Sequence, residues 1–270
     1  MSGTAQGAAL TEALFEFLLR TGDNTLILGH RVSEWCGHAP VLEEDIALAN
    51  VALDLIGQTR LWLGLAAEVE GKGRNADKLA YLRDAAEFRN VLLVERPNGD
   101  FGMTLMRQFL FDAWHIGLLE ALTRSTDARI AEIAAKAVKE VTYHLERSSG
   151  LVVGLGDGSE ESHRRMQDAL DDLWPYTGEL FIADGADRAL AEAGVAPPPE
   201  SLKTKWEATV RHVVSEATLR APTSGFAHKG GKRGVHTEHL GYILADMQFL
   251  QRAYPGANWY ADAVSDASEP

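Results

Sequence analysis

Apolar residues recur with the spacing of an α-helix along nearly the whole chain, and the alternation typical of strands never extends beyond a few residues. Four predicted helices are long and mostly apolar, and they cover residues 10–36, 42–70, 102–124 and 128–155. Glycine or proline follows the first two of them. Because each long apolar helix must bury its apolar face against another element, this pattern predicts a helical bundle.

The predicted fold is all-α: a ferritin-like four-helix bundle with an inserted short helix, over 77–94, and additional C-terminal helices. Those later helices are expected over 160–193, with a kink or a restart at Pro175, and over 201–219 and 236–253. The last helix is predicted to present one apolar face, made of Leu240, Ile243, Leu244, Met247 and Leu250.

These elements predict one folded domain with a flexible segment at each end. We expect a flexible N-terminus over residues 1–9 and a single domain over 10–255. Within it, the core bundle covers about 10–155 and the C-terminal helices about 160–255. The tail, 256–270, is acidic and serine-bearing, which predicts disorder.

Charge and composition exclude several classes of partner. The formal net charge is −13, which argues against nucleic acid and against an anionic membrane. The most apolar stretch, residues 46–67, is interrupted by polar and charged residues, so it is too polar to span a membrane. The single cysteine, Cys36, is expected to be a buried apolar residue. One cysteine cannot form a disulfide within the chain, which fits a reducing cytoplasm. No signal-peptide pattern opens the chain, so the predicted location is cytoplasmic.

Two segments of the predicted bundle carry part of a metal-ligand pattern. A di-iron centre in such a bundle needs a carboxylate from each of two helices and a Glu-x-x-His pair from each of the other two. Residues i and i+3 share a helix face, so one turn supplies an oxygen and a nitrogen ligand. Asp112 and His144 fit two of these positions. Val141 stands where His144 needs its glutamate, and Glu140 is rotated from that position by about 100°.

The other two helices leave the pattern incomplete. Leu55 and Gln58 stand at the expected Glu-x-x-His positions of the second helix. Leucine and valine cannot bind iron, so this chain is predicted to bind no metal and to have no catalytic residue of its own. The first helix offers only further candidates: Asp23, Asn24, His30 and Glu34.

Polar residues around this position are predicted to form a buried hydrogen-bond and ion-pair network in place of a metal. Its members are Asn50, Asp54, Gln58, Asp112, His115, Glu140 and His144. Buried carboxylates in such a network need partners, for which Arg60 and Arg147 are candidates. Two alternatives stay open: a two-metal centre with unusual ligands, and an outer face that carries these residues.

Two further motifs have weaker support. His236 and Glu238 match the His-x-Glu of zinc deaminases, but the required Pro-Cys-x-x-Cys segment is absent, so a helix start is the better interpretation. The glycine-rich basic loop 229–234 could cradle phosphates with its backbone N–H groups. It lacks the Walker spacing, and the alternative is a solvated loop or a contact between subunits.

Long strings of the sequence resemble one family. They are Asp23-Asn24, Glu34 to Pro40, Leu48 to Asn50, Leu53 to Leu55, Gly57-Gln58, Leu92 to Gly99, Asp112 to His115, Tyr143 to Leu145 and His236 to Gly241. On these strings the chain is similar to the C subunits of phenylacetyl-CoA epoxidases, from about Thr21 to Tyr254.

The resemblance implies a role in a multicomponent monooxygenase of aerobic phenylacetate breakdown. In that family a homologous A subunit holds the di-iron centre and epoxidises the ring of phenylacetyl-CoA, further small subunits take part, and a reductase uses NADPH. The C subunit is ferritin-like and non-catalytic, and it pairs with and stabilises the A subunit. The alternatives are a di-iron oxygenase in its own right, with a non-standard ligand set, and an iron-storage or unrelated helical binding protein.

Two hypotheses concern the partner and the substrate. The first and second helices have few polar positions, so an apolar face is expected to be buried against the catalytic subunit. Phenylacetyl-CoA is a candidate ligand at the subunit junction. Its edge could contact the aromatic and cationic segment Glu87, Phe88, Arg89 and Asn90, for which ordinary packing is the alternative.

Overall fold

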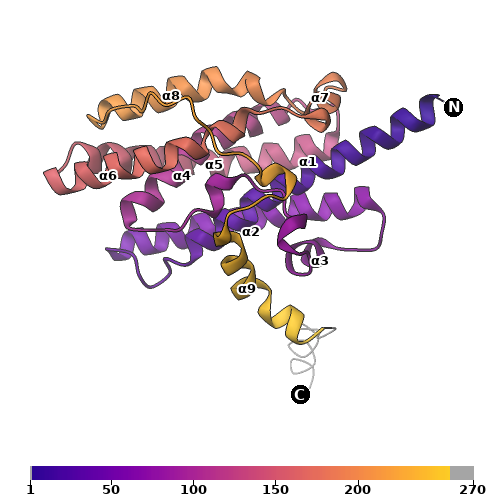
Figure 1. The fold of residues 1–270 in the computed structure, drawn as a ribbon, viewed down its shortest axis with the longest axis horizontal. Helices are drawn as coiled ribbons and strands as arrows, with labels where there is room; N and C mark the ends of the chain where they lie inside the picture. The colour runs from indigo at the N-terminus through magenta and orange to yellow at the C-terminus, as the bar shows by residue number, and fades with distance from the viewer. Residues whose placement is uncertain (1, 256–270) are drawn as a thin grey trace, which may run out of the picture.

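Four long helices form the bundle of this computed structural model, which describes residues 2–255 (Figure 1). They are α1 (Ser2–Ser33), α2 (Leu42–Glu70), α4 (Phe101–Leu122) and α5 (Ala128–Gly156). Helix α1 packs along α2, and α4 packs along α5. The predicted all-α, ferritin-like architecture is therefore confirmed. Helix α1 begins at Ser2, earlier than the expected start near residue 10, and the tail 256–270 lies outside the described residues.

Shorter elements complete the described chain. The remaining α-helices are α3 (Ala76–Tyr81), α6 (Glu160–Leu173), α7 (Gly185–Glu192), α8 (Lys203–Glu216) and α9 (Glu238–Ala253). The 3-10 turns are η1 (Ala85–Glu87), η2 (Leu92–Glu95), η3 (Trp174–Tyr176), η4 (Gly178–Phe181), η5 (Pro199–Leu202) and η6 (Gly231–Arg233). Helices α6 and α8 pack on α4 and α5, whereas α9 extends away from the bundle (Figure 1).

Local sequence signals set most helix boundaries. The side chains of Asp100, Asp127 and Ser159 accept hydrogen bonds from backbone N–H groups in the first turns of α4, α5 and α6. Gly71 ends α2 in the left-handed region, with φ of 68°. Pro175 lies in the 3-10 turn that begins at Trp174, directly after α6, which confirms the predicted interruption there.

The predicted helix over 77–94 is wrong, because α3 ends at Tyr81 and the chain continues in short turns and extended residues. The backbone N–H of Arg89 donates to Asp23 Oδ2 at 2.8 Å, and that of Val91 donates to Asn24 Oδ1 at 2.8 Å. These donors therefore bond side chains of α1 instead of carbonyls one helical turn earlier. We call this contact between α1 and residues 83–95 the α1 seam.

A buried ion pair anchors the α1 seam. Asp23 is fully buried and Arg83 is 2% exposed, and the Arg83 guanidinium donates to both carboxylate oxygens of Asp23. The same guanidinium lies over the Phe88 ring, 4.3 Å from its centroid. Gln248 of α9 donates to the Arg83 carbonyl at 3.0 Å, so the seam also holds the last helix.

Buried carboxylates fix the C-terminal loop against the α1 seam. Glu95 accepts from Asn90 and from the Thr237 N–H, and it contacts His236 Nδ1 at 2.8 Å. Glu179 Oε1 accepts from the Gly230 N–H at 2.7 Å. The glycine-rich loop 229–234 therefore directs backbone N–H groups at a carboxylate of the same chain. His236 lies just before the start of α9, as expected, but its polar contacts are with Glu95 and the Phe88 carbonyl and not with the preceding loop.

Two expectations about exposure are wrong. Leu250 is 50% exposed, whereas the other four members of its predicted α9 face are buried. Leu250 lies near the C-terminal end of α9, where the contacts of the helix are made by the polar side chains of Gln248 and Arg252, which donate to the Arg83 carbonyl. Cys36 is exposed, because it lies in the turn after α1 and not within the helix.

Candidate functional site

Two of the expected ligand positions in the bundle hold buried hydrocarbon. Leu55 of α2 and Val141 of α5 are both fully buried. Asp112 of α4 and His144 of α5 are buried as well, so polar and apolar groups share this interior. We call the polar residues of this interior and of its rim the interhelical centre: Gln58, Asp112, His115 and His144 are buried, and Asp54 and Glu140 are partly exposed.

Asp112 is held by neutral partners. Gln108 Nε2 donates to its Oδ1 at 2.7 Å, and Ser148 Oγ donates to its Oδ2 at 2.9 Å. Burial raises the pKa of Asp112 to about 6, although His144 and the two hydrogen bonds act in the opposite direction. Both carboxylate oxygens are thus already engaged by side chains of α4 and α5.

Two polar bridges join α2 to α5. His144 Nε2 lies 2.9 Å from Asp54 Oδ2, and Gln58 Nε2 donates to Glu140 Oε2 at 3.0 Å. The Asp54 side chain is 37% exposed, so this bridge reaches the surface of the bundle. His144 Nε2 therefore faces the carboxylate of Asp54 and not Asp112.

His115 is packed as an aromatic ring. Its side chain is 1% exposed, and no described residue bonds either of its ring nitrogens. Its centroid lies 5.0 Å from that of Phe111. Burial, together with a smaller effect of the His144 charge, lowers the pKa of His115 to about 3. The imidazole is consequently neutral near pH 7.

The expected seven-residue network is not a single network. Its contacts form separate sets, and Asn50 is exposed, so its assignment to a buried network is wrong. Residues four apart on a helix are rotated by about 40° per step, so a stripe from Asn50 through Asp54 to Gln58 turns from solvent into the bundle. Arg60 is also exposed, and Arg147 pairs with Glu44 instead of a residue of the interhelical centre.

The interhelical centre does not fit a di-iron site. Nowhere among residues 2–255 do three or more His, Cys, Asp or Glu side chains gather closely enough to hold a metal ion. On α1, Asp23 and Asn24 bond the α1 seam, and Glu34 pairs with Arg31. Burial lowers the pKa of the remaining α1 candidate, His30. No reaction step through iron can therefore be assigned to these side chains.

The segment proposed for substrate contact has structural roles. Phe88 and Asn90 are fully buried, and the cation over the Phe88 ring is Arg83, not Arg89. Arg89 donates to the carbonyls of Ala86 and Phe88, and the Glu87 carboxylate accepts from the Asp84 N–H. This segment offers no open aromatic face, because its backbone is drawn against α1.

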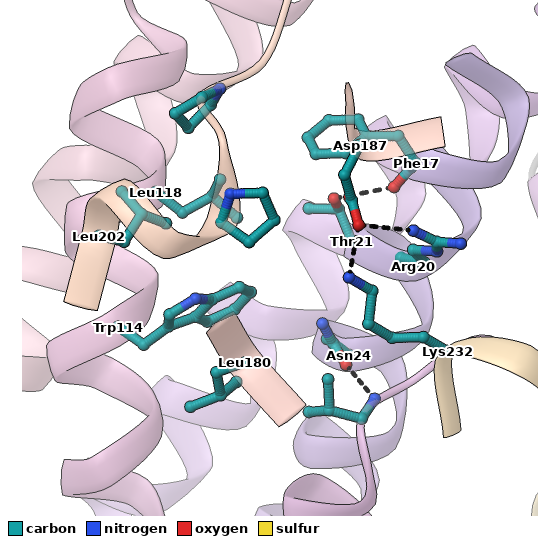
Figure 2. A pocket seen from close by; sticks show the side chains of 13 residues that line it. Phe17, Arg20, Thr21, Asn24, Trp114, Leu118, Leu180, Asp187, Leu202 and Lys232 are labelled. Carbon is teal, nitrogen blue, oxygen red and sulfur yellow. Dashed lines mark hydrogen bonds and ion pairs between the residues drawn. The ribbon is translucent and has the colours of Figure 1, made fainter. Parts of the chain in front are cut away.

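A small cavity that sequence reasoning missed lies between α1, α4 and the C-terminal segments (Figure 2). Its volume is about 40 Å³, enough for a few water molecules. Arg20 and Lys232 both reach Asp187, at 3.2 and 2.8 Å, along one side of it (Figure 2). The indole N–H of Trp114 on the opposite wall has no partner among the described side chains. The sequence feature that could have indicated this cavity is the glycine-rich loop, because it carries Lys232 to Asp187.

Comparison with known proteins places the chain in a family. Residues 2–259 match the family model described as "Phenylacetic acid catabolic protein". The chain is 51% identical, over 246 residues, to the C subunit of the 1,2-phenylacetyl-CoA epoxidase of Escherichia coli (strain K12). That match covers 91% of this chain and 99% of its relative. The chain belongs to the phenylacetic acid catabolic protein family.

Membership of the phenylacetic acid catabolic protein family agrees with the resemblance carried by the motifs. Asp112 to His115 and Tyr143 to Leu145, two of the quoted strings, line or flank the interhelical centre. Within the described part of the chain, no helix is both long enough and apolar enough to cross a membrane.

Proposed function

We propose that this protein is a non-catalytic structural subunit of a phenylacetyl-CoA epoxidase, a di-iron monooxygenase of phenylacetate breakdown in the cytoplasm. It pairs with a homologous catalytic subunit, which carries the two iron atoms, and a reductase in the complex uses NADPH. The name of the Escherichia coli relative, and the near-complete coverage of its length, support this assignment.

Buried hydrocarbon at ligand positions is the observation that carries the non-catalytic role. Leu55 and Val141 offer no donor atom to iron, and both oxygens of Asp112 are engaged. Iron in a carboxylate bundle needs several anionic oxygens to balance its charge. An oxygenase centre in this chain would need ligands at the positions that these two apolar side chains occupy.

An exposed apolar stripe on α2 supports the pairing. Leu42, Ile46 and Leu53 are 70%, 54% and 69% exposed, and their spacing places them on one side of the helix. Exposed apolar side chains that gather along one helix mark a surface that another protein covers. We assign this stripe to the catalytic subunit, which would bury it on pairing.

Iron content and assembly test the proposal. After anaerobic ferrous reconstitution, the purified chain should hold well below one iron atom per chain, and close to two atoms would contradict the proposal. Leu53→Asp should abolish co-purification with the catalytic subunit, whereas Leu82→Asp, at another exposed leucine, should not. Without this chain, the catalytic subunit should lose solubility, and unchanged activity in its absence would contradict the proposed pairing.

A further inference from the structure

A row of four cationic and aromatic side chains lies outside the interhelical centre. The Arg96 guanidinium stands over the Tyr176 ring, 4.5 Å from its centroid. Tyr176 stacks on His228 with centroids 4.6 Å apart, and Phe226 meets His228 edge-on at 4.8 Å and 87°. We call these four residues the basic aromatic cluster. Phe226 is 62% exposed, so a flat ring surface faces solvent at its end.

The loops that carry the basic aromatic cluster are fixed to each other. The His228 N–H donates to the Pro175 carbonyl at 2.8 Å. Gly178 lies so close to this loop that a Cβ at its position would fall 2.4 Å from Ala227 Cβ. The stacking order therefore follows from a close backbone approach, and the cluster is preformed in the chain.

The cluster includes Arg96, and Lys229 follows His228 directly in its loop, although the whole chain is acidic. The neighbouring carboxylates of Glu95 and Glu179 are buried and already accept hydrogen bonds from Thr237 and Gly230. Among residues 2–255, no ion pair joins a carboxylate to Arg96 or to Lys229, which is exposed. Arg107, directly behind Arg96, is fully buried, and its guanidinium donates only to the Arg96 carbonyl and to Asn98 Oδ1, at 2.5 and 2.6 Å. Its Nε has no partner among residues 2–255.

A nearby anion would offset this buried charge. Burial lowers the pKa of Arg107 to about 9, and the positive charges of Arg31 and Arg96 lower it as well. Glu34 acts in the opposite direction, but it is already paired with Arg31. Like charges that share a low-dielectric region favour the approach of a counter-charge.

We propose that the basic aromatic cluster binds the nucleotide end of a CoA thioester, with the adenine on the Phe226 ring and the phosphates beside Arg96 and Lys229. Exposed aromatic rings stack on bases of any sequence, and guanidinium groups pair with phosphates. The net charge of −13 disfavours a nucleic acid polymer, whereas one nucleotide needs only this local cluster. The assignment rests on the proposed function, because that function supplies the CoA thioester.

Calorimetric titration of the full-length chain with coenzyme A tests the site. Coenzyme A should bind and pantetheine, which lacks the nucleotide, should not. Phe226→Ala should weaken coenzyme A binding by about tenfold or more, because it removes the stacking surface. Arg96→Ala should weaken binding and flatten its dependence on salt. Tyr242→Ala is the matched control, because Tyr242 is an aromatic residue of α9 that is 66% exposed, close to the value for Phe226. The Tyr242→Ala variant should bind coenzyme A with the affinity of the wild type.

Either of two results would overturn the site: no binding of coenzyme A to the wild-type chain, or equal affinity for Phe226→Ala and Tyr242→Ala. Co-purification with the catalytic subunit separates this failure from a failure of the proposed function. A wild-type chain that assembles but does not bind coenzyme A refutes only the nucleotide site. A wild-type chain that does not assemble refutes the proposed function itself.

Discussion

Asp23 and Asp112 are both fully buried aspartates, and their partners differ in charge. In the α1 seam, Asp23 accepts from the guanidinium of Arg83 and from the Arg89 N–H. In the interhelical centre, Asp112 accepts only from neutral groups, and its pKa is raised to about 6. A buried carboxylate stabilises a fold only when its desolvation is offset by a well-placed partner. The α1 seam meets this condition and the interhelical centre does not.

Neighbouring groups repeat the contrast. Glu95 and Glu179 in and near the α1 seam each accept several hydrogen bonds, and these join segments far apart in the chain. In the interhelical centre, both ring nitrogens of His115 and Nδ1 of His144 lack a partner among the described residues. The seam thus holds the fold together, whereas the centre contains polar groups whose burial is only partly compensated.

Removing the cation of the α1 seam should have the largest effect. Arg83→Ala leaves Asp23 buried without its charged partner, so the free energy of unfolding should fall by about 3–5 kcal/mol. Urea unfolding at pH 7 measures the change. Arg164→Ala, which removes exposed ion pairs, is the control and should unfold like the wild type. A loss below about 1 kcal/mol for Arg83→Ala would contradict the distinction between seam and centre.

Removing the charge of Asp112 should have the opposite sign. Its pKa is about 6 in the folded chain and near 3.8 in the unfolded chain, so at pH 8 the ionised group costs up to about 3 kcal/mol. Asp112→Asn should therefore stabilise the protein at pH 8 by about 1–3 kcal/mol. This advantage should vanish toward pH 4, where the folded carboxyl is protonated. Urea midpoints at both pH values test it, and Asp23→Asn, the matched variant of the seam, should destabilise at both.

The sequence predicted the bundle well because its signals are local. Periodicity and flanking turn residues gave α2, α4 and α5 within about two residues of their observed ends. The segment after Tyr81 could not be predicted in this way, because its backbone donors bond Asp23 and Asn24, which are distant in the chain. Helix propensity describes the preference of a segment in isolation. Here the conformation of the segment is determined by hydrogen bonds to α1.

The interhelical centre was predictable in part for the same reason. Spacing along α2 and α5 placed Leu55 and Val141 at ligand positions, and both are buried. Spacing could not show that Ser148 and Gln108 bond Asp112, nor that Asn50 faces solvent, because pairing across helices depends on their relative rotation. The basic aromatic cluster was invisible for a further reason, since it joins three segments that share no motif.

The smallest expected effect concerns two buried histidines, His115 in the centre and His236 against the seam. Burial holds the folded pKa of His115 near 3, so acidification from pH 7.5 to 5.5 protonates it only in the unfolded chain. With an unfolded pKa of about 6.5, this costs the wild type about 1.4 kcal/mol, and His115→Gln should remove that loss.

Burial alone would lower the pKa of His236 too, but its contacts with Glu95 raise it overall. Its stabilisation is therefore complete below pH 6.5 and is lost as the pH rises through the folded pKa, so His236→Gln should remove a gain on acidification. Relative to the wild type, the change in unfolding free energy between pH 7.5 and 5.5 should have opposite signs for His115→Gln and His236→Gln. The same sign for both variants would show that the seam and the centre affect a buried histidine in the same way.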